Sequence, residues 1–437
     1  MNFFLTRFFS NKYFANSIWT GVEKLARIAY VIFIGSWIAR YLGPSDYGIY
    51  SYVFAVLTIF ILISRLGLPD LLVRYLTPRE ADVEKILTSV FALKLISCST
   101  LICLAWFLHK INLVNGFVAI LSFSLLFQIV NPIEQYLIAK VQFKYVAICK
   151  VTQMLIMGCV YAYLIIYEQS LKSFIYVYLI EELLLALFFL LFIRTLNIHQ
   201  NKINFAYGYD LLKQGLPLLF SSFFVIVMMR TDQIMIHYFL NTEAVGIYAA
   251  ASRVAEAFYF IPALFMAALS PSLINAFNTN QKTFKFRYAV FYQILFLTSI
   301  FLILILYYFS PWLVSALYGP SYIESIIIIQ IYMWALCPVF INALNTQWFI
   351  CHNFTKTILL LTLMSCLINI LLNWMMIPLI GLKGSAIATV LSQIIPLIAL
   401  LAFDHGRENL KILFTSTKEV LNIKKIFRLM EGKVDDI

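Results

Sequence analysis

Long apolar segments alternate with short polar ones along almost the whole chain. A helix needs roughly 20 apolar residues to cross about 30 Å of hydrocarbon, and twelve segments reach that length. We therefore predict an all-α integral membrane protein with twelve transmembrane helices. The predicted spans are residues 17–39, 46–67, 86–108, 114–139, 146–167, 171–193, 216–240, 245–273, 288–310, 323–350, 357–377 and 383–403.

The chain contains an internal repeat. The tripeptide Gly48-Ile49-Tyr50 returns 198 residues later as Gly246-Ile247-Tyr248, each time between two long apolar segments. Each copy follows residues that end one helix and cap the next, Gly43-Pro44-Ser45-Asp46 in the first and Asn241-Thr242-Glu243 in the second. Both copies are therefore predicted to form the tight turn of a helical hairpin.

A second match lies later in each half. Gln135-Tyr136-Leu137-Ile138 corresponds to Gln347-Trp348-Phe349-Ile350 at an offset of 212 residues. A longer loop in the second half would account for the difference between the two offsets. Because internal repeats of this length are typical of transporter folds, we predict two similar lobes of six helices each.

Basic residues indicate how the chain is oriented, since Lys and Arg collect in cytoplasmic loops. With the N-terminus inside, the cytoplasmic segments hold 21 Lys and Arg and the opposite side holds four. Both termini are therefore predicted to be cytoplasmic. Because each lobe has an even number of spans, both lobes begin on the same side of the membrane and have the same orientation. Their pseudo-two-fold axis should therefore run along the membrane normal. The predicted parts are an N-lobe (1–193), a cytoplasmic linker (194–215), a C-lobe (216–403) and a cytoplasmic basic tail (404–437).

Composition supports a membrane protein. The 437 residues are 62% hydrophobic and 12% charged, which excludes a soluble globule. The net charge of +11 is explained by cytoplasmic loops and tail, so we expect no nucleic-acid partner. Basic residues at helical spacing in the tail fit an amphipathic helix on the inner leaflet, although a solvated tail fits them as well.

Reactive residues form no recognisable catalytic pattern. The seven cysteines include no C-x-x-C pair and the five histidines are scattered, so neither a metal site nor another cofactor is expected. Phosphate-loop, nucleophile-elbow and zinc-protease motifs do not occur in the sequence. We predict a protein that is not an enzyme.

Ionisable residues within the predicted spans are the candidate functional residues. Facing lipid, seven of them at roughly 2.5 to 3.5 kcal/mol each would cost on the order of 20 kcal/mol. That exceeds the ~5 to 15 kcal/mol by which proteins are usually stable, so they must face protein or water. They are Arg27, Glu181, Glu182, Arg230, Asp232, Arg253 and Glu256.

Two arrangements satisfy this requirement, buried ion pairs or a hydrated cavity between the lobes. Glu23 with Arg27 and Arg253 with Glu256 have the spacing of pairs on one helix. A cavity, which we favour, would bind an anion through Lys24, Arg27, Arg230 and Arg253, while Glu181, Glu182, Asp232 and Glu256 would tune it or carry a coupling proton. Arg65, Lys150 and Glu134 lie near cytoplasmic ends of spans, where snorkelling or water explains them without a transport role.

Prolines mark places where spans can bend, because each removes a backbone hydrogen bond. We predict hinges in the fourth, eighth and tenth spans, although prolines are common in membrane helices. The candidate hinge residues are Pro132, Pro262 and Pro338.

Three stretches together resemble a known family. They are Ala39 to Tyr50, Arg230-Thr231-Asp232-Gln233 in the seventh span and Val245-Gly246-Ile247-Tyr248 opening the eighth. They are similar to the polysaccharide flippases, transporters of O-antigen and capsule repeat units, within the multidrug/oligosaccharidyl-lipid/polysaccharide (MOP) exporter superfamily. Length and span number agree over the whole chain.

The resemblance implies a bacterial inner-membrane protein with a MATE/MOP-like fold, two lobes around a central cavity that opens alternately to either side. Its implied substrate is an undecaprenyl-pyrophosphate-linked oligosaccharide, flipped from the cytoplasmic to the periplasmic leaflet. Membrane lipids, a polysaccharide polymerase and a chain-length regulator are the implied partners. No matched motif assigns roles to the ionisable residues above.

Two other functions fit part of the pattern. A cation-coupled drug exporter of the same superfamily would favour an anionic cavity, which the basic residues argue against. A membrane polysaccharide polymerase has a similar number of spans, but it would need a large outer loop, and the predicted outer loops are short.

Overall fold

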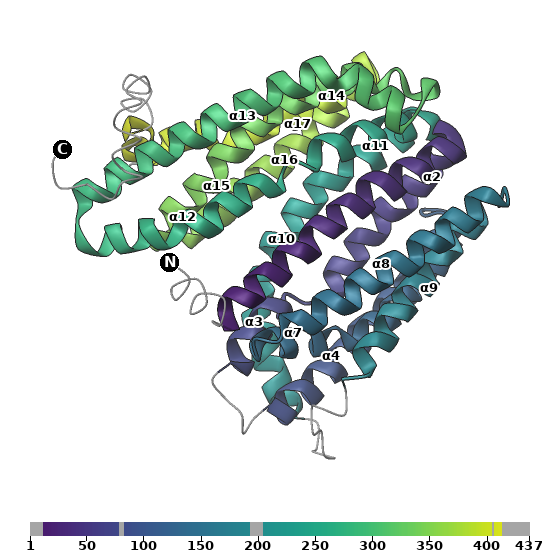
Figure 1. Cartoon of the computed structure of the whole chain (residues 1–437), viewed down its shortest axis with the longest axis horizontal. Coiled ribbons are helices and arrows are strands. Elements are labelled where there is room, and N and C mark those ends of the chain that lie inside the picture. Colours follow the sequence, from purple (N-terminus) through teal and green to yellow (C-terminus); the bar gives the residue numbers. More distant parts are fainter. Residues whose placement is uncertain (1–11, 78–82, 193–203, 404–405, 413–437) are drawn as a thin grey trace, which may run out of the picture. The chain divides into compact units, whose positions relative to one another are not determined.

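The computed structural model describes residues 12–77, 83–192, 204–403 and 406–412, and within them every regular element is a helix (Figure 1). In this part of the chain, eleven helical stretches are long and apolar enough to cross a membrane. The predicted all-α membrane fold is therefore confirmed. The eleven stretches run over Ile18–Ser64, Val83–Lys110, Gly116–Ala139, Phe143–Ile166, Leu171–Leu190, Ala206–Phe239, Thr242–Thr279, Gln281–Leu317, Ser325–Cys351, Thr355–Ile380 and Leu382–Ala402.

The chain divides into two compact units, Met1–His237 and Tyr238–Ile437. The main helices of the first unit are α2 (Lys12–Ser64), α3 (Leu68–Leu76), α4 (Val83–Lys110), α5 (Gly116–Leu121), α6 (Ser124–Phe127), α7 (Asn131–Ala139), α8 (Phe143–Ile166), α9 (Leu171–Leu190) and α10 (Phe205–Phe239). Those of the second are α11 (Thr242–Glu256), α12 (Phe260–Thr279), α13 (Gln281–Leu317), α14 (Ser325–Tyr332), α15 (Leu336–Cys351), α16 (Thr355–Ile380) and α17 (Leu382–Ala399).

Helix α2 contains two of the predicted spans. Its backbone leaves the helical conformation at Gly43 (φ 73°, ψ 170°). Tyr30 donates a hydrogen bond to Glu181 at 3.3 Å, and the Phe54 ring packs against Tyr178, only three residues before Glu181 on α9. On a straight helix Tyr30 and Phe54 would be roughly 36 Å apart. The chain therefore turns back at Gly43, as predicted, so the first of the eleven stretches found in the described residues contains two helices.

The repeat is also present in the backbone. Asn241, in the second copy of the turn, has an extended backbone and accepts a hydrogen bond from the Ala244 amide at 2.8 Å, which caps α11. Val141 and Asn353, 212 residues apart, both have positive φ, at 58° and 61°. The predicted internal repeat is thus confirmed by turns of matching conformation.

The unit boundary differs from the lobe boundary predicted from the sequence. Helix α10, the predicted seventh span, belongs to the first unit. Tyr75 donates a hydrogen bond to Gln214 at 2.7 Å, and the Lys85 ammonium lies 5.1 Å from the centroid of the Tyr207 ring. These contacts attach the first turns of α10 to α3 and α4. The predicted lobe limits stay predictions, and residues 194–203 of the predicted linker lie outside the described residues.

Most of the predicted tail, residues 404–405 and 413–437, also lies outside the described residues. Residues 406–412 are helical and are held by the second unit. Asn409 is buried and donates a hydrogen bond to Asn345 at 3.1 Å, while Lys285 forms an ion pair with Glu408 at 2.7 Å. The first turns after the last span are therefore packed against protein.

Helix breaks precede all three candidate hinge prolines. Pro132 is the second residue of α7 and follows a 3₁₀ turn, whereas Pro262 and Pro338 are the third residues of α12 and α15. Proline is tolerated in the first turn of a helix, where its missing amide would lack a partner in any case. The breaks supply the local geometry of a hinge, and hinge motion stays a prediction.

Candidate functional site

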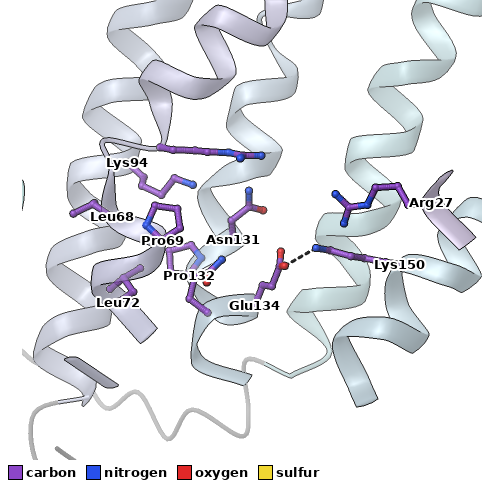
Figure 2. A pocket seen from close by; sticks show the side chains of 11 residues that line it. Arg27, Leu68, Pro69, Leu72, Lys94, Asn131, Pro132, Glu134 and Lys150 are labelled. Atoms are coloured by element: carbon purple, nitrogen blue, oxygen red, sulfur yellow. Dashed lines mark hydrogen bonds and ion pairs between the residues drawn. The ribbon is translucent and has the colours of Figure 1, made fainter. Parts of the chain in front are cut away.

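A cavity of about 250 Å³ lies within the first unit (Figure 2). Its walls come from α2, the turn between α2 and α3, and helices α3, α4, α7 and α8. Four basic side chains and one acidic side chain line it. The lining residues are Arg27, Arg65, Leu68, Pro69, Leu72, Lys94, Asn131, Pro132, Glu134, Gln135 and Lys150.

An apolar cluster fixes the helices on one side of the cavity. Leu68 and Leu72 of α3 line the cavity and belong to the same buried cluster as Ile133 and Leu137 of α7. Each of these four side chains is at most 2% exposed. Side chains packed to this degree hold α3 and α7 in one relative position. The polar residues of α7 that line the cavity therefore project from a rigidly held helix.

Lys94 is the buried cation of the site. Its side chain is 4% exposed, and its ammonium donates a hydrogen bond to the Gln128 carbonyl oxygen at 2.7 Å. Within the described residues no carboxylate lies at ion-pair distance from it. Burying a charge without a counter-charge costs several kcal/mol. Lys94 therefore adds to the cavity a positive charge that no direct ion pair within the described residues neutralises.

Arg65, at the end of α2, is the second such cation. Its side chain is exposed at the cavity and makes neither a hydrogen bond nor a close ion pair within the described part of the chain. Its position follows from the local backbone, since Leu66 and Gly67 both have positive φ and turn the chain from α2 into α3. Arg65 and Lys94 together provide the cavity with two cations that form no direct ion pair with a described carboxylate.

The other two cations are paired with carboxylates. Arg27 donates through Nε to Glu23 Oε1 at 3.0 Å, and its terminal nitrogen also contacts that oxygen. Lys150 forms an ion pair with Glu134 at 2.5 Å. Figure 2 shows Lys94 entering the cavity from one side and Arg27 and Lys150 from the other, with Glu134 between them. Among the lining residues that the structure describes, four positive charges stand against one negative charge, so this lining is cationic overall.

Glu181 and Glu182, predicted to line a cavity, do not line this one. Glu181 accepts hydrogen bonds from Gln153 at 2.9 Å and from Tyr30 and Tyr161 at 3.3 Å each. Glu182 accepts one from Tyr178 at 3.0 Å. These bonds replace the hydration that a carboxyl group loses inside a membrane protein.

The remaining candidate residues lie elsewhere. Lys24 is exposed on α2, Arg230 is half-buried on α10, and Asp232 on α10 is 1% exposed. Arg253 and Glu256 are half-buried on α11 in the second unit, where Tyr332 donates a hydrogen bond to Glu256 at 3.4 Å. Of the predicted cationic set, only Arg27 lines the cavity.

Sequence reasoning did not select Arg65, Lys94, Lys150 and Glu134 as site residues. Three of them lie near the ends of predicted spans, where a charge has an ordinary explanation. Depth along a span does not reveal which side of the helix faces a neighbour. The sequence feature that could have indicated the site is Lys94, a basic residue well inside a long apolar segment.

Comparisons with known proteins identify a family and a fold for this chain. A family model described as "Polysaccharide biosynthesis protein" matches residues 37–327. No curated protein matches the chain.

Among solved structures, an inward-facing multidrug resistance MATE family transporter of the MOP superfamily is 15% identical. The match covers 90% of this chain and 96% of that one, with a TM-score of 0.68. The lipid II flippase MurJ, in an inward closed conformation, is 18% identical over 93% of this chain and 91% of its own, with a TM-score of 0.67.

A third structure, a MOP superfamily transporter from Pyrococcus furiosus described as having a binding pocket of reverse polarity, is 14% identical. That match covers 92% of this chain and 96% of the other, with a TM-score of 0.62. At these identities the likeness establishes the fold, which is that of the MOP superfamily.

Proposed function

The chain belongs to the polysaccharide biosynthesis protein family, and from that premise we propose that it flips undecaprenyl-pyrophosphate-linked oligosaccharide repeat units from the cytoplasmic to the periplasmic leaflet by alternating access. The family resemblance predicted from the sequence is confirmed, and so is the superfamily fold. One observation carries the proposal of substrate, namely the four basic side chains that line the cavity of the first unit.

A pyrophosphate group matches Arg65 and Lys94, the two cations that form no direct ion pair within the described residues. The planar guanidinium of Arg65 can bind phosphate oxygens through two parallel hydrogen bonds, whereas the Lys94 ammonium acts as a point charge. Lys94 has already lost its hydration on burial, so its attraction to an anion is stronger than in water. Arg27 and Lys150 would add to the positive potential without giving up their own partners.

The place of the cavity agrees with loading from the cytoplasm. Arg65 lies in the turn between α2 and α3 and Leu72 lies on α3, both near the connection between the second and third predicted spans, whereas Glu134 and Lys150 flank the turn between α7 and α8. Both connections are cytoplasmic in the orientation that the basic residues predict. We accordingly propose a bacterial inner-membrane location with both termini in the cytoplasm, and a polysaccharide polymerase and a chain-length regulator as partners.

The cavity charge also separates this proposal from a drug exporter. A transporter of cationic drugs would place carboxylates where this chain has Arg65 and Lys94, because like charges repel a bound cation. An excess of cations therefore favours an anionic cargo.

The direct test is transport by full-length protein in liposomes. The probe is a fluorescent undecaprenyl-pyrophosphate-linked N-acetylglucosamine, and the readout is its accessibility in the outer leaflet. We expect the double variant Arg65→Gln/Lys94→Met to bind undecaprenyl pyrophosphate at least about tenfold more weakly and to flip the probe more slowly. Lys94→Met keeps the length and packing of the side chain, which protects the fold.

Lys172→Ala is the matched control, since Lys172 is an exposed basic residue on α9 that does not line the cavity. It should bind and flip like the wild type. Wild-type binding and flipping by the Arg65→Gln/Lys94→Met protein would overturn the proposal.

A further inference from the structure

Two amide side chains line the cavity beside the cations. Asn131 and Gln135 lie four residues apart on α7 and therefore on the same face of that helix. Both are half-buried, and neither side chain makes a hydrogen bond within the described residues. Figure 2 shows Asn131 between Lys94 and Glu134. The cavity thus presents hydrogen-bonding groups that no described side chain engages.

The internal repeat provides a comparison for Gln135. Its counterpart 212 residues later is Gln347, on α15 of the second unit. The Gln347 Oε1 atom accepts a hydrogen bond from the Ser270 hydroxyl at 3.1 Å. The same position of the repeat is therefore used for packing in one unit and faces a cavity in the other. This difference indicates that Gln135 is kept for a ligand.

The chemistry of an amide identifies the part of the ligand that it contacts. An amide offers two N–H donors and one carbonyl acceptor, whereas a pyrophosphate accepts hydrogen bonds and would be repelled by a carbonyl oxygen. Sugar hydroxyl and acetamido groups both donate and accept. Asn131 and Gln135 are thus suited to a neutral sugar, next to an anion held by Arg65 and Lys94.

The size of the cavity restricts which sugar this is. At about 250 Å³ it falls just below the ~300 to 1,000 Å³ of sites for drug-sized ligands. It therefore holds a head-group fragment and not a whole oligosaccharide. The sugar within reach of the amides is the one bonded directly to the pyrophosphate.

We propose that Asn131 and Gln135 are specificity-determining residues that bind this first sugar, so that the site selects a sugar-bearing carrier lipid over bare undecaprenyl pyrophosphate. The inference rests on the proposed function. A site built to hydrogen-bond a group rejects an analogue lacking it, because the polar groups of the site are then left unpaired. The selection prevents the flippase from moving the empty carrier.

The test compares two probes, undecaprenyl pyrophosphate and undecaprenyl-pyrophosphate-linked N-acetylglucosamine, bound to full-length protein in nanodiscs. We expect the wild type to bind the sugar-bearing lipid about tenfold more tightly. Gln135→Met and Asn131→Leu should each reduce that preference to about threefold or less, by weakening binding of the sugar-bearing lipid, by strengthening binding of the bare lipid, or both. Gln135→Met preserves side-chain length, so it remains informative if Asn131→Leu disturbs the start of α7.

Gln347→Met is the matched control, because it makes the same change at the equivalent position of the other unit. It should keep the wild-type preference. A preference that survives Gln135→Met, or one that Gln347→Met reduces equally, overturns the inference, as does equal wild-type binding of the two lipids. Wild-type protein that binds neither lipid would instead remove the proposed function itself.

Discussion

Gly67 and Gly215 meet backbone to backbone. A Cβ atom on Gly67 would lie 2.8 Å from the Leu219 amide nitrogen and closer still to the Gly215 carbonyl oxygen. Gly67 also has a φ of +65°, in the left-handed region that L-residues with a side chain rarely adopt. The contact fastens α10 to the turn that carries Arg65 into the cavity. It explains why α10 belongs to the first unit.

Substitution of either glycine by alanine should therefore destabilise the protein. We expect Gly67→Ala and Gly215→Ala each to lower the free energy of unfolding by about 1 to 3 kcal/mol through overpacking. Gly67→Ala should lose about 1 to 2 kcal/mol more because of its backbone conformation. Thermal unfolding in detergent measures both effects. Gly21→Ala is the control, since an added Cβ there meets nothing within 4 Å, and a melting temperature equal to those of the other two variants would refute the packing argument.

Removal of the cavity carboxylate should strengthen anion binding. In Glu134→Gln, Lys150 loses its ion pair and the lining keeps four cations without a negative charge. We expect affinity for undecaprenyl pyrophosphate to rise about tenfold, equivalent to about 1.4 kcal/mol. Glu408→Gln makes the same chemical change in the Lys285 pair of the second unit and should leave binding unaltered. Unchanged or weaker binding by Glu134→Gln would contradict a cationic ligand site.

The segment after the last span should contribute to stability through Asn409. The Tyr288 hydroxyl lies 2.8 Å from Asn345 Oδ1 and 3.1 Å from Asn409 Oδ1, in a fully buried cluster. Asn409→Ala removes one partner, and we expect a loss of about 1 to 3 kcal/mol, measured as a lower melting temperature. Lys411→Ala alters an exposed residue of the same segment and should melt like the wild type. Indistinguishable melting of the two variants would show that the cluster adds nothing.

Proline replacement tests the hinge prediction. Pro338→Ala restores an amide next to the break between α14 and α15, which allows the helix to continue. We expect unchanged or higher thermal stability. Flipping should be slowed at least about threefold, because conformational steps often limit the overall rate of such a cycle. Pro311→Ala changes a proline inside α13 and serves for comparison. Flipping that is equally fast in both variants would remove Pro338 as a hinge.

Local patterns predicted the architecture well because they act over short distances. Hydropathy located the spans, and Gly43 and Asn241 marked two turns that the structure contains. The repeat seen in Gln135 and Gln347 continues into turns of matching conformation at Val141 and Asn353. Helix caps, breaks and apolar runs depend on residues a few positions apart, and these are present in the sequence itself.

The site was harder to predict from the sequence, because contacts between segments far apart in the chain decide which residues line a cavity. Arg65 and Lys150 were assigned to span ends, and their depth was the only information that the sequence offered. Lys94 on α4, Asn131 on α7 and Arg27 on α2 line one cavity only after the helices have packed, and the buried cluster that includes Leu68, Leu72 and Ile133 is part of that packing.

By itself, the sequence determined that the chain crosses a membrane in repeated helices and that its buried charges need protection from lipid. The tertiary structure decided which charges share a cavity and which are satisfied by their neighbours, as Glu181 is by Gln153 and two tyrosines. The physical reason is that hydrophobicity specifies how deep a residue lies, whereas the direction of its side chain is set by helix packing.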